Sequence, residues 1–495
     1  MKQPKGKIHQ LIQAMSPAEK RYFKRHYASP QGNLTQLFDF INGMQEYDEE
    51  LIKKEFSDSK LSQNLKVYKV QLLNLLLKSL VSYHSKQSIK SQIRIGLEEV
   101  DVLMEKQLYK HAQDRLKRIK KECQKYQEYT YLIEIAYKEF RLQYIQRDRS
   151  GMSKNPIYNE LKESIKHLEE QVQLTLLSAQ VMDYRKSINK LESPTAYQDY
   201  CEKIMTENPL MRFDTEELTF RSNLSRNIIL SNIYSFLQDS ENHRSLKKEN
   251  VDLFEQQPHF KSYLTFEYLA VLLNYTNLCL EEKNYKKVEV MVEQARHFAG
   301  DNPVFKRQLI YFYYALIKAN FERRKFSDNL IDLEDKVLVL LKEYQIQKER
   351  IALIIYYQFA LCYLAFEKPK KVQAYVRLMH QCHSEPHSFF AELIYIIELI
   401  HHYETRDENI LANIVSSLQR KFKTQKNEFF GAILRLFNKL IKYPGQQDEL
   451  AQKFIAEIEH YSNDKVYFLF HHMELEVWLQ ALKNKNSYAV EIKKA

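Results

Sequence analysis

The densest group of metal-ligand residue types is the segment HQCHSEPH, which contains His380, Cys382, His383 and His387. Imidazole and thiolate groups are the usual ligands of zinc, and structural zinc sites combine two pairs of them. No second pair with Cys-x-x-Cys or His-x-x-x-His spacing occurs elsewhere in the chain. Pro386 favours a loop between helices, where polar residues are expected. We therefore predict no metal and no other cofactor.

The residues that catalysis requires do not occur in recognisable patterns. The adjacent pairs His401-His402 and His471-His472 diverge by about 100° on a helix, so neither pair can share a metal. The closest two of the eight glycines are eleven residues apart. This spacing excludes phosphate loops, dinucleotide fingerprints and nucleophile elbows, all of which need neighbouring glycines. The sequence thus predicts a protein that is not an enzyme.

Basic residues concentrate at the start of the chain. Residues 1–90 contain 15 Lys and Arg against 8 Asp and Glu, a net of +7 within a total of +10. The stretch YDEELIKKEFSDSKLSQNLKVYKVQLL could form a helix, a turn and a second helix in a DNA major groove. The residues that would then face DNA are Lys60, Gln63, Asn64, Lys66 and Lys69. The turn lacks glycine and the acidic run at 48–50 would repel phosphate, so DNA binding is an alternative hypothesis.

Composition favours a folded helical protein. The 495 residues are 44% apolar, 13% aromatic and 28% charged, and glycine and proline are scarce. Five scattered cysteines without Cys-x-x-Cys spacing indicate reduced thiols in the cytoplasm, and the first residues contain no apolar signal segment. The apolar run 351–366 is 16 residues long, shorter than the roughly 20 that a membrane span requires. It is predicted to be a buried helix, and no membrane association is expected.

Helical spacing of apolar residues predicts elements along the whole chain. Residues 1–90 contain five predicted helices, of which the second begins with Ser16 as N-cap, Pro17 and a capping-box Glu19. From residue 91 the pattern changes to helix pairs. One such pair breaks at Lys283-Asn284, between the apolar faces of 272–279 and 285–295.

The second helix of this pair resembles the tetratricopeptide repeat family in four positions, Tyr285, Val288, Val292 and Ala295. Aligned turns at Tyr285, Phe326 and Pro369 are 41 and 43 residues apart, which is longer than the 34 of the family and near other helical-hairpin repeats. The resemblance covers about 60% of the chain.

We therefore expect an all-α protein, an α-solenoid of antiparallel, tetratricopeptide-like helix hairpins with an N-terminal helical unit. The predicted divisions are a basic helical unit at 1–90, hairpins at 91–264 that become irregular, clearer repeats at 265–462, and a closing helix with a tail at 463–495. In the last division, Leu475, Leu479 and Leu482 are expected to face inward.

The resemblance implies that the first helices of successive hairpins line a concave groove for a protein or peptide partner. Carried over by position, the groove residues would be Leu273, Asn277, Tyr311, Tyr314, Lys318 and Tyr357. Leu273 and Tyr314 stand at the positions where family members that bind chaperone tails have lysines. This difference argues against a carboxylate clamp. An alternative role for these tyrosines is packing between hairpins. An alternative function for the chain is that of a peptide-sensing transcription regulator with a DNA-binding N-terminal unit. The oligomeric state stays undetermined.

Overall fold

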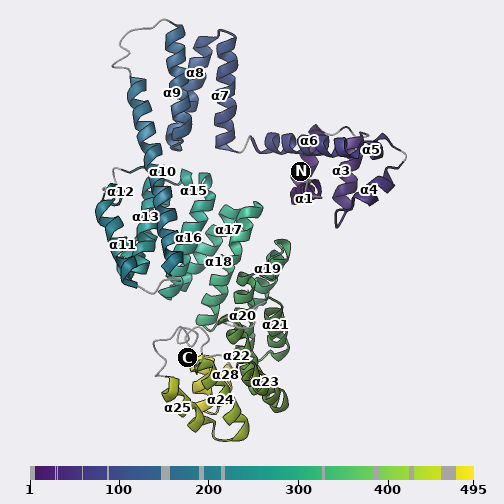
Figure 1. The fold of residues 1–495 in the computed structure, drawn as a ribbon, viewed down its shortest axis with the longest axis vertical. Coiled ribbons are helices and arrows are strands. Elements are labelled where there is room, and N and C mark those ends of the chain that lie inside the picture. The colour runs from purple at the N-terminus through teal and green to yellow at the C-terminus, as the bar shows by residue number, and fades with distance from the viewer. Residues whose placement is uncertain are drawn as a thin grey trace. The chain divides into compact units, whose positions relative to one another are not determined.

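The computed structural model describes residues 6–27, 29, 32–57, 59–85, 88–146, 156–188, 194–212, 218–325, 329–382, 389–422, 428–458 and 475–494. Within these ranges the regular structure is entirely helical, and helices that are neighbours in sequence pack in pairs (Figure 1). The chain divides into two compact units, one formed by Met1–Ser193 and Glu202–Arg226, the other by Pro194–Cys201 and Asn227–Ala495. The predicted all-α class is confirmed.

Unit 1 begins with the N-terminal helices and continues with longer ones. Its helices are α1 (Lys7–Ala14), α2 (Pro17–His26), α3 (Asn33–Gly43), α4 (Glu49–Glu55), α5 (Lys60–Gln63), α6 (Leu65–Ser85), α7 (Ile89–Glu105), α8 (Tyr109–Lys125), α9 (Tyr129–Ile145), α10 (Pro156–Ile188) and α12 (Pro209–Arg212). Helix α11 (Pro194–Glu207) and helix α13 (Phe220–Phe236) have residues in both units. The first ninety residues therefore contain α5 in addition to the five predicted helices.

The N-terminus of α2 follows the predicted capping box. The backbone N–H of Ser16 donates to the Glu19 carboxylate at 2.6 Å, and the Glu19 N–H donates to the Ser16 hydroxyl at 3.3 Å. These bonds satisfy backbone donors that have no partner within the helix. The start of α2 directs Phe23 into a core that it shares with Phe38 of α3 and Leu72 of α6, all fully buried.

A second core is formed by the predicted helix pair α7 and α8 together with α9. The two helices approach closely at Gly96, where an added Cβ would lie 2.8 Å from Cδ1 of Ile119. Glycine is therefore needed at position 96 because the two helices are too close for a Cβ atom there, and not because of its backbone angles.

Unit 2 continues the paired arrangement. Its helices are α14 (Ser240–Gln256), α15 (His259–Tyr263), α16 (Thr265–Glu281), α17 (Tyr285–Ala299), α18 (Pro303–Glu322), α19 (Asn329–Glu343), α20 (Arg350–Ala365), α21 (Pro369–Cys382), α22 (Phe389–Glu404), α23 (Glu408–Lys421), α24 (Glu428–Lys442), α25 (Gln447–Ile458), α27 (Leu475–Lys483) and α28 (Tyr488–Ile492). Beyond the sequential pairs, α16 packs on α14 and α18, and α20 packs on α18 and α22.

The predicted break at Lys283-Asn284 is a helix–helix turn with a left-handed residue. Lys283 has a φ of 56°, and the N–H of Asn284 donates to the Cys279 carbonyl at 2.7 Å. This backbone bond is characteristic of a Schellman motif, which satisfies free carbonyls at a helix end. The same geometry recurs at Gln107, Glu367 and Lys485. Long polar side chains thus occupy a conformation that usually favours glycine, which explains why no glycine marks these turns.

The apolar run 351–366 forms α20 and is interior, as predicted. Its residues from Tyr356 to Ala365 are all buried. In the described part of the chain, no helix is long and apolar enough to cross a membrane.

A buried carboxylate joins the helices on either side of α20. Glu334 of α19 is 2% exposed and accepts hydrogen bonds from the hydroxyl groups of Tyr363 and Tyr375. The Lys371 ammonium donates to the same carboxylate at 2.8 Å. Burial, followed by these contacts with Glu334, raises the pKa of both tyrosines. The cluster ties α19 to α20 and α21.

Residues 475–494, the described part of the chain end, contain two helices where one closing helix was expected. Leu475, Leu479 and Leu482 are buried in α27, as predicted. Helix α28 packs on α20, and its residues Tyr488, Ala489 and Ile492 are also buried. The sequence prediction missed α28 because its five residues are too few to show a helical repeat.

Candidate partner-binding surface

The six predicted groove residues lie on three helices, α16, α18 and α20, of which α18 packs on the other two. Asn277 is exposed, Leu273, Tyr314 and Lys318 are partly buried, and Tyr311 is 42% exposed. Tyr357 is only 9% exposed, because α20 is covered by its neighbours. The predicted groove residues of α16 and α18 are therefore at the surface, whereas Tyr357 of α20 lies mainly in the core.

Two exposed apolar residues that the sequence reasoning missed extend these helix faces. Phe266 is 54% exposed and lies seven residues before Leu273 on α16, so both point in nearly the same direction. Val304 is 61% exposed and lies seven residues before Tyr311 on α18. The same helical spacing, followed one further step toward each N-terminus, would have found them. We call Phe266, Leu273, Val304, Tyr311 and Tyr314 the α16–α18 face.

Two ion pairs lie beside the apolar residues of α18. Lys318 lies 3.7 Å from the carboxylate of Glu322 on the same helix. One turn before Tyr311, the guanidinium of Arg307 lies 3.3 Å from Glu349, the N-cap residue of α20. Burial, then the nearby Glu322, raises the pKa of Tyr314, so its phenol is uncharged at neutral pH. The α18 part of the face is therefore aromatic and aliphatic, with one ion pair between Val304 and Tyr311 and a second beyond Tyr314.

The second candidate site is the predicted DNA-contact set on α5 and the start of α6. Lys60, Gln63, Asn64 and Lys66 are all exposed, so the structure leaves these four side chains accessible. Directly after these residues, however, α6 exposes the apolar side chains of Val67 and Val70. Valine side chains make no contact with phosphate, which limits the electrostatic part of DNA binding.

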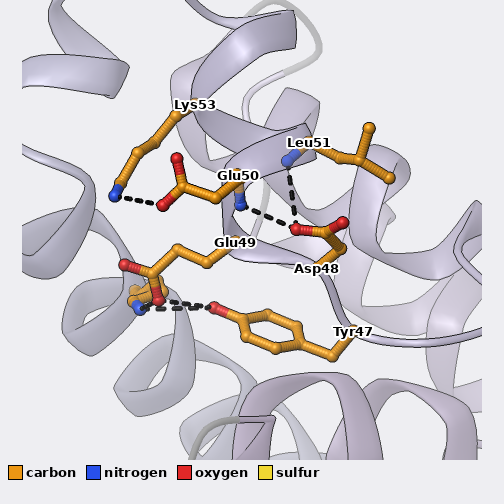
Figure 2. Close-up of polar contacts among 7 residues, drawn as sticks. Tyr47, Asp48, Glu49, Glu50, Leu51 and Lys53 are labelled. Atoms are coloured by element: carbon orange, nitrogen blue, oxygen red, sulfur yellow. Dashed lines mark hydrogen bonds and ion pairs between the residues drawn. The ribbon is translucent and has the colours of Figure 1, made fainter.

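Lys69, the fifth residue of this set, is paired with the acidic start of α4. Its ammonium lies 2.7 Å from Glu49 and donates to the hydroxyl of Tyr47 at 3.2 Å. The hydrogen bond from Lys69 is the main reason why the pKa of Glu49 is lowered. Figure 2 shows the hydroxyl of Tyr47 beside the carboxylate of Glu49. It also shows Asp48 at the N-terminus of α4, where its carboxylate accepts hydrogen bonds from the N–H groups of Glu50 and Leu51. A carboxylate thus offsets the charge of Lys69.

A basic cluster on α2 was missed by the sequence reasoning. Arg21 and Arg25 are exposed, and no carboxylate among the described residues lies within ion-pair distance of either. Lys24 between them is paired with Asp39 at 2.5 Å. Spacing of i and i+4 would have placed the two arginines on one face of the helix.

The segment HQCHSEPH is described only as far as Cys382. His380 lies 3.1 Å from Glu398, and the Cys382 thiol donates to the Gln347 carbonyl at 3.0 Å. His383 and His387 lie outside the described residues. Among the side chains that are described, no group of three or more His, Cys, Asp and Glu is arranged to hold a metal ion.

Comparisons with known proteins leave the chain without an assigned relative: no family model, no curated protein and no solved structure matches it. The class of protein therefore follows from the fold alone. It is an all-helical protein whose helices pack with their sequence neighbours.

Proposed function

We propose that the protein is a non-enzymatic scaffold that binds a protein or an extended peptide on the α16–α18 face. The observation that carries this proposal is the alignment of exposed Phe266 and Val304 with Leu273 and Tyr311 on two helices that pack together. Large apolar side chains in solvent are costly when clustered and are characteristic of interaction sites. Aromatic residues contribute strongly to such interfaces.

The architecture that we propose for this scaffold is an α-solenoid of antiparallel hairpins similar to tetratricopeptide repeats. The recurring left-handed turn at Lys283 and Glu367 supports it, as do the additional contacts of α16 with α14 and α18. A stack of this kind is preformed, so binding imposes little ordering cost on the scaffold. We place the protein in the cytoplasm, which is supported by the buried thiols of Cys123 and Cys279.

A peptide-display selection against the full chain, followed by calorimetric titration of the selected peptides, tests this function. We expect peptides rich in apolar residues to bind, and Tyr311→Ala together with Phe266→Ala to weaken binding by about 1–3 kcal/mol. Val339→Ala is the matched control, because Val339 is 62% exposed on α19, outside this face. Equal binding by the face variant and the control would contradict the proposed site.

The alternative function is a peptide-sensing transcription regulator that binds DNA through its N-terminal helices. The exposure of Lys60, Gln63, Asn64 and Lys66, together with the exposed Arg21 and Arg25 of α2, favours this second candidate. It predicts binding to duplex DNA that weakens steeply with salt and is reduced by Lys60→Ala with Lys66→Ala. Fluorescence anisotropy of labelled duplexes at low salt measures this binding. No binding at low salt would exclude the alternative.

A further inference from the structure

Helix α6 is apolar on two sides, of which only one is covered. Leu65, Leu72 and Leu76 point into the N-terminal core and are almost fully buried. The opposite side exposes Val67 (52%), Val70 (42%), Leu77 (47%) and Val81 (69%). A continuous row of exposed apolar residues on a helix is characteristic of an interaction site, so the exposed row indicates a partner.

The exposed row has the spacing of a coiled-coil seam. Val67, Val70, Asn74, Leu77 and Val81 are separated by three, four, three and four residues. This spacing places Val67, Asn74 and Val81 at a positions and Val70 and Leu77 at d positions of a heptad. We call these five residues the α6 seam. Valine at the two outer a positions and leucine at one of the two d positions are the residues that favour two parallel strands, whereas Val70 at the other d position departs from this pattern.

Asn74 identifies the kind of partner. It is exposed and lies at the central a position of the seam, between apolar residues. An asparagine at an a position is costly against an apolar surface, but it can hydrogen-bond to the same asparagine of an identical helix in register. A generic apolar partner would leave its amide unpaired. The seam is therefore best matched by a second copy of itself.

The charges beside the seam are compatible with this pairing. In a parallel pair, residues at g positions lie opposite e positions of the other helix. Lys66 at g would face Gln71 at e, and Leu73 at g would face Lys78 at e. No two like charges are opposed, and the ion pair of Lys69 with Glu49 lies away from the seam, at a c position.

We propose that the chain forms a parallel homodimer through the α6 seam, with Asn74 of the two copies opposed in register. The seam covers about two heptads, which is fewer than the three to four that sustain an independent coiled coil. The dimer is therefore expected to dissociate in the micromolar range and to exchange subunits. This inference is independent of the α16–α18 face.

Sedimentation velocity of the full chain over the nanomolar to high-micromolar range tests the dimer. We expect a concentration-dependent dimer for the native sequence, and a monomer throughout for Leu77→Glu. Val81→Glu is the second variant, because Val81 is the most exposed of the four apolar seam residues and its change does not disturb the core. Val102→Glu on α7, 55% exposed, is the matched control and should dimerise normally. A native chain that is monomeric at all concentrations, or dimers of Val81→Glu as strong as native, would overturn the proposal.

Disulfide trapping tests the register. Side chains at a shared a layer are close enough for a disulfide, whereas those at e positions diverge. Under mild oxidation we expect Asn74→Cys to form a covalent dimer, and Lys78→Cys and the native chain to remain uncrosslinked. Dimerisation with efficient trapping at Lys78→Cys and none at Asn74→Cys would refute the parallel, in-register arrangement.

Discussion

The indole Nε1 of Trp478 donates a hydrogen bond of 3.1 Å to the carboxylate of Glu404, and this bond joins α27 to α22. The backbone N–H of Tyr488 donates to the same carboxylate at 3.1 Å, which adds α28 to the contact. Burial is the main reason why the pKa of Glu404 is raised. One side chain thus positions both C-terminal helices.

We expect Glu404→Ala to lower the free energy of unfolding by about 2–3 kcal/mol, because it leaves a buried indole N–H without its acceptor. Trp478 is the only tryptophan and is fully buried, so its fluorescence reports directly on this contact. The emission of the variant should shift to longer wavelength. The variant should also unfold at a lower urea concentration than the native protein. Glu408→Ala, at an exposed position on α23, is the control. Identical emission from Glu404→Ala and native protein would count against the positioning role.

The carboxylate of Glu334 should be among the most sensitive positions of unit 2. Glu334→Ala removes the acceptor of the buried phenols Tyr363 and Tyr375, at a cost of about 1–3 kcal/mol for each hydroxyl left without a partner. Lys371 also loses its counter-charge, but its side chain is 54% exposed and is solvated by water. We expect faster hydrogen exchange over α19 and α21, measured by mass spectrometry. Glu343→Ala, which is exposed at the end of the same helix, should change exchange little. Equal effects of both variants would contradict a structural role for the cluster.

Glycine at a left-handed turn residue should stabilise the fold. Gln107 has a φ of 61°, so Gln107→Gly relieves the Cβ penalty and is expected to gain roughly 0.5–1 kcal/mol. Gln113→Gly is the matched control, because Gln113 lies inside α8, where glycine should cost about 1 kcal/mol. Thermal unfolding followed by circular dichroism measures both. A loss of stability in Gln107→Gly comparable to the control would show that the side chain of Gln107 contributes more than its backbone costs.

His401 should make stability depend on pH. Burial, then repulsion from His402, lowers the pKa of its imidazole from 6.5 to about 4, although Asp407 and Glu398 act in the opposite direction. The unfolded chain therefore binds the proton at higher pH than the native protein. Stability from this group is complete above pH 6.5 and is lost as the pH falls toward 4, by up to about 3 kcal/mol.

Urea denaturation at pH 7 and pH 5 measures this dependence. His401→Gln should reduce the difference between the two pH values, whereas His26→Gln, at an exposed position, should leave it unchanged. If the two variants lose stability equally on acidification, another group is responsible.

The ion pair between Lys69 and Glu49 should contribute little to stability. Both side chains are partly exposed, at 23% and 35%, so Glu49→Gln is expected to cost less than about 1 kcal/mol. The same variant frees the charge of Lys69 and tests the DNA alternative. If that alternative holds, Glu49→Gln should raise DNA affinity and increase the salt slope by about one, as measured by anisotropy. Unchanged DNA affinity and salt slope in this variant would contradict the DNA alternative.

The sequence by itself determined the features that depend on neighbouring residues. The capping box of Ser16 and Glu19, the helix break at Lys283-Asn284 and the burial of α20 all follow from spacing within a few turns. Helical hydrogen bonds connect residues four apart, so periodicity and caps are present in the local sequence. Helix α28, which the sequence did not predict, is the exception, because its five residues are fewer than one apolar repeat.

Only the tertiary structure decided which similar residues are surface and which are core. Tyr311 and Tyr357 were predicted for the same groove, yet Tyr311 is exposed and Tyr357 is buried in α20, which packs on α18, α21, α22 and α28. Glu334 meets Tyr363 and Tyr375 across 29 and 41 residues, and Lys69 meets Glu49 across 20. Such contacts depend on how helices pack, and side-chain spacing within one helix carries no information about the neighbour that will cover it.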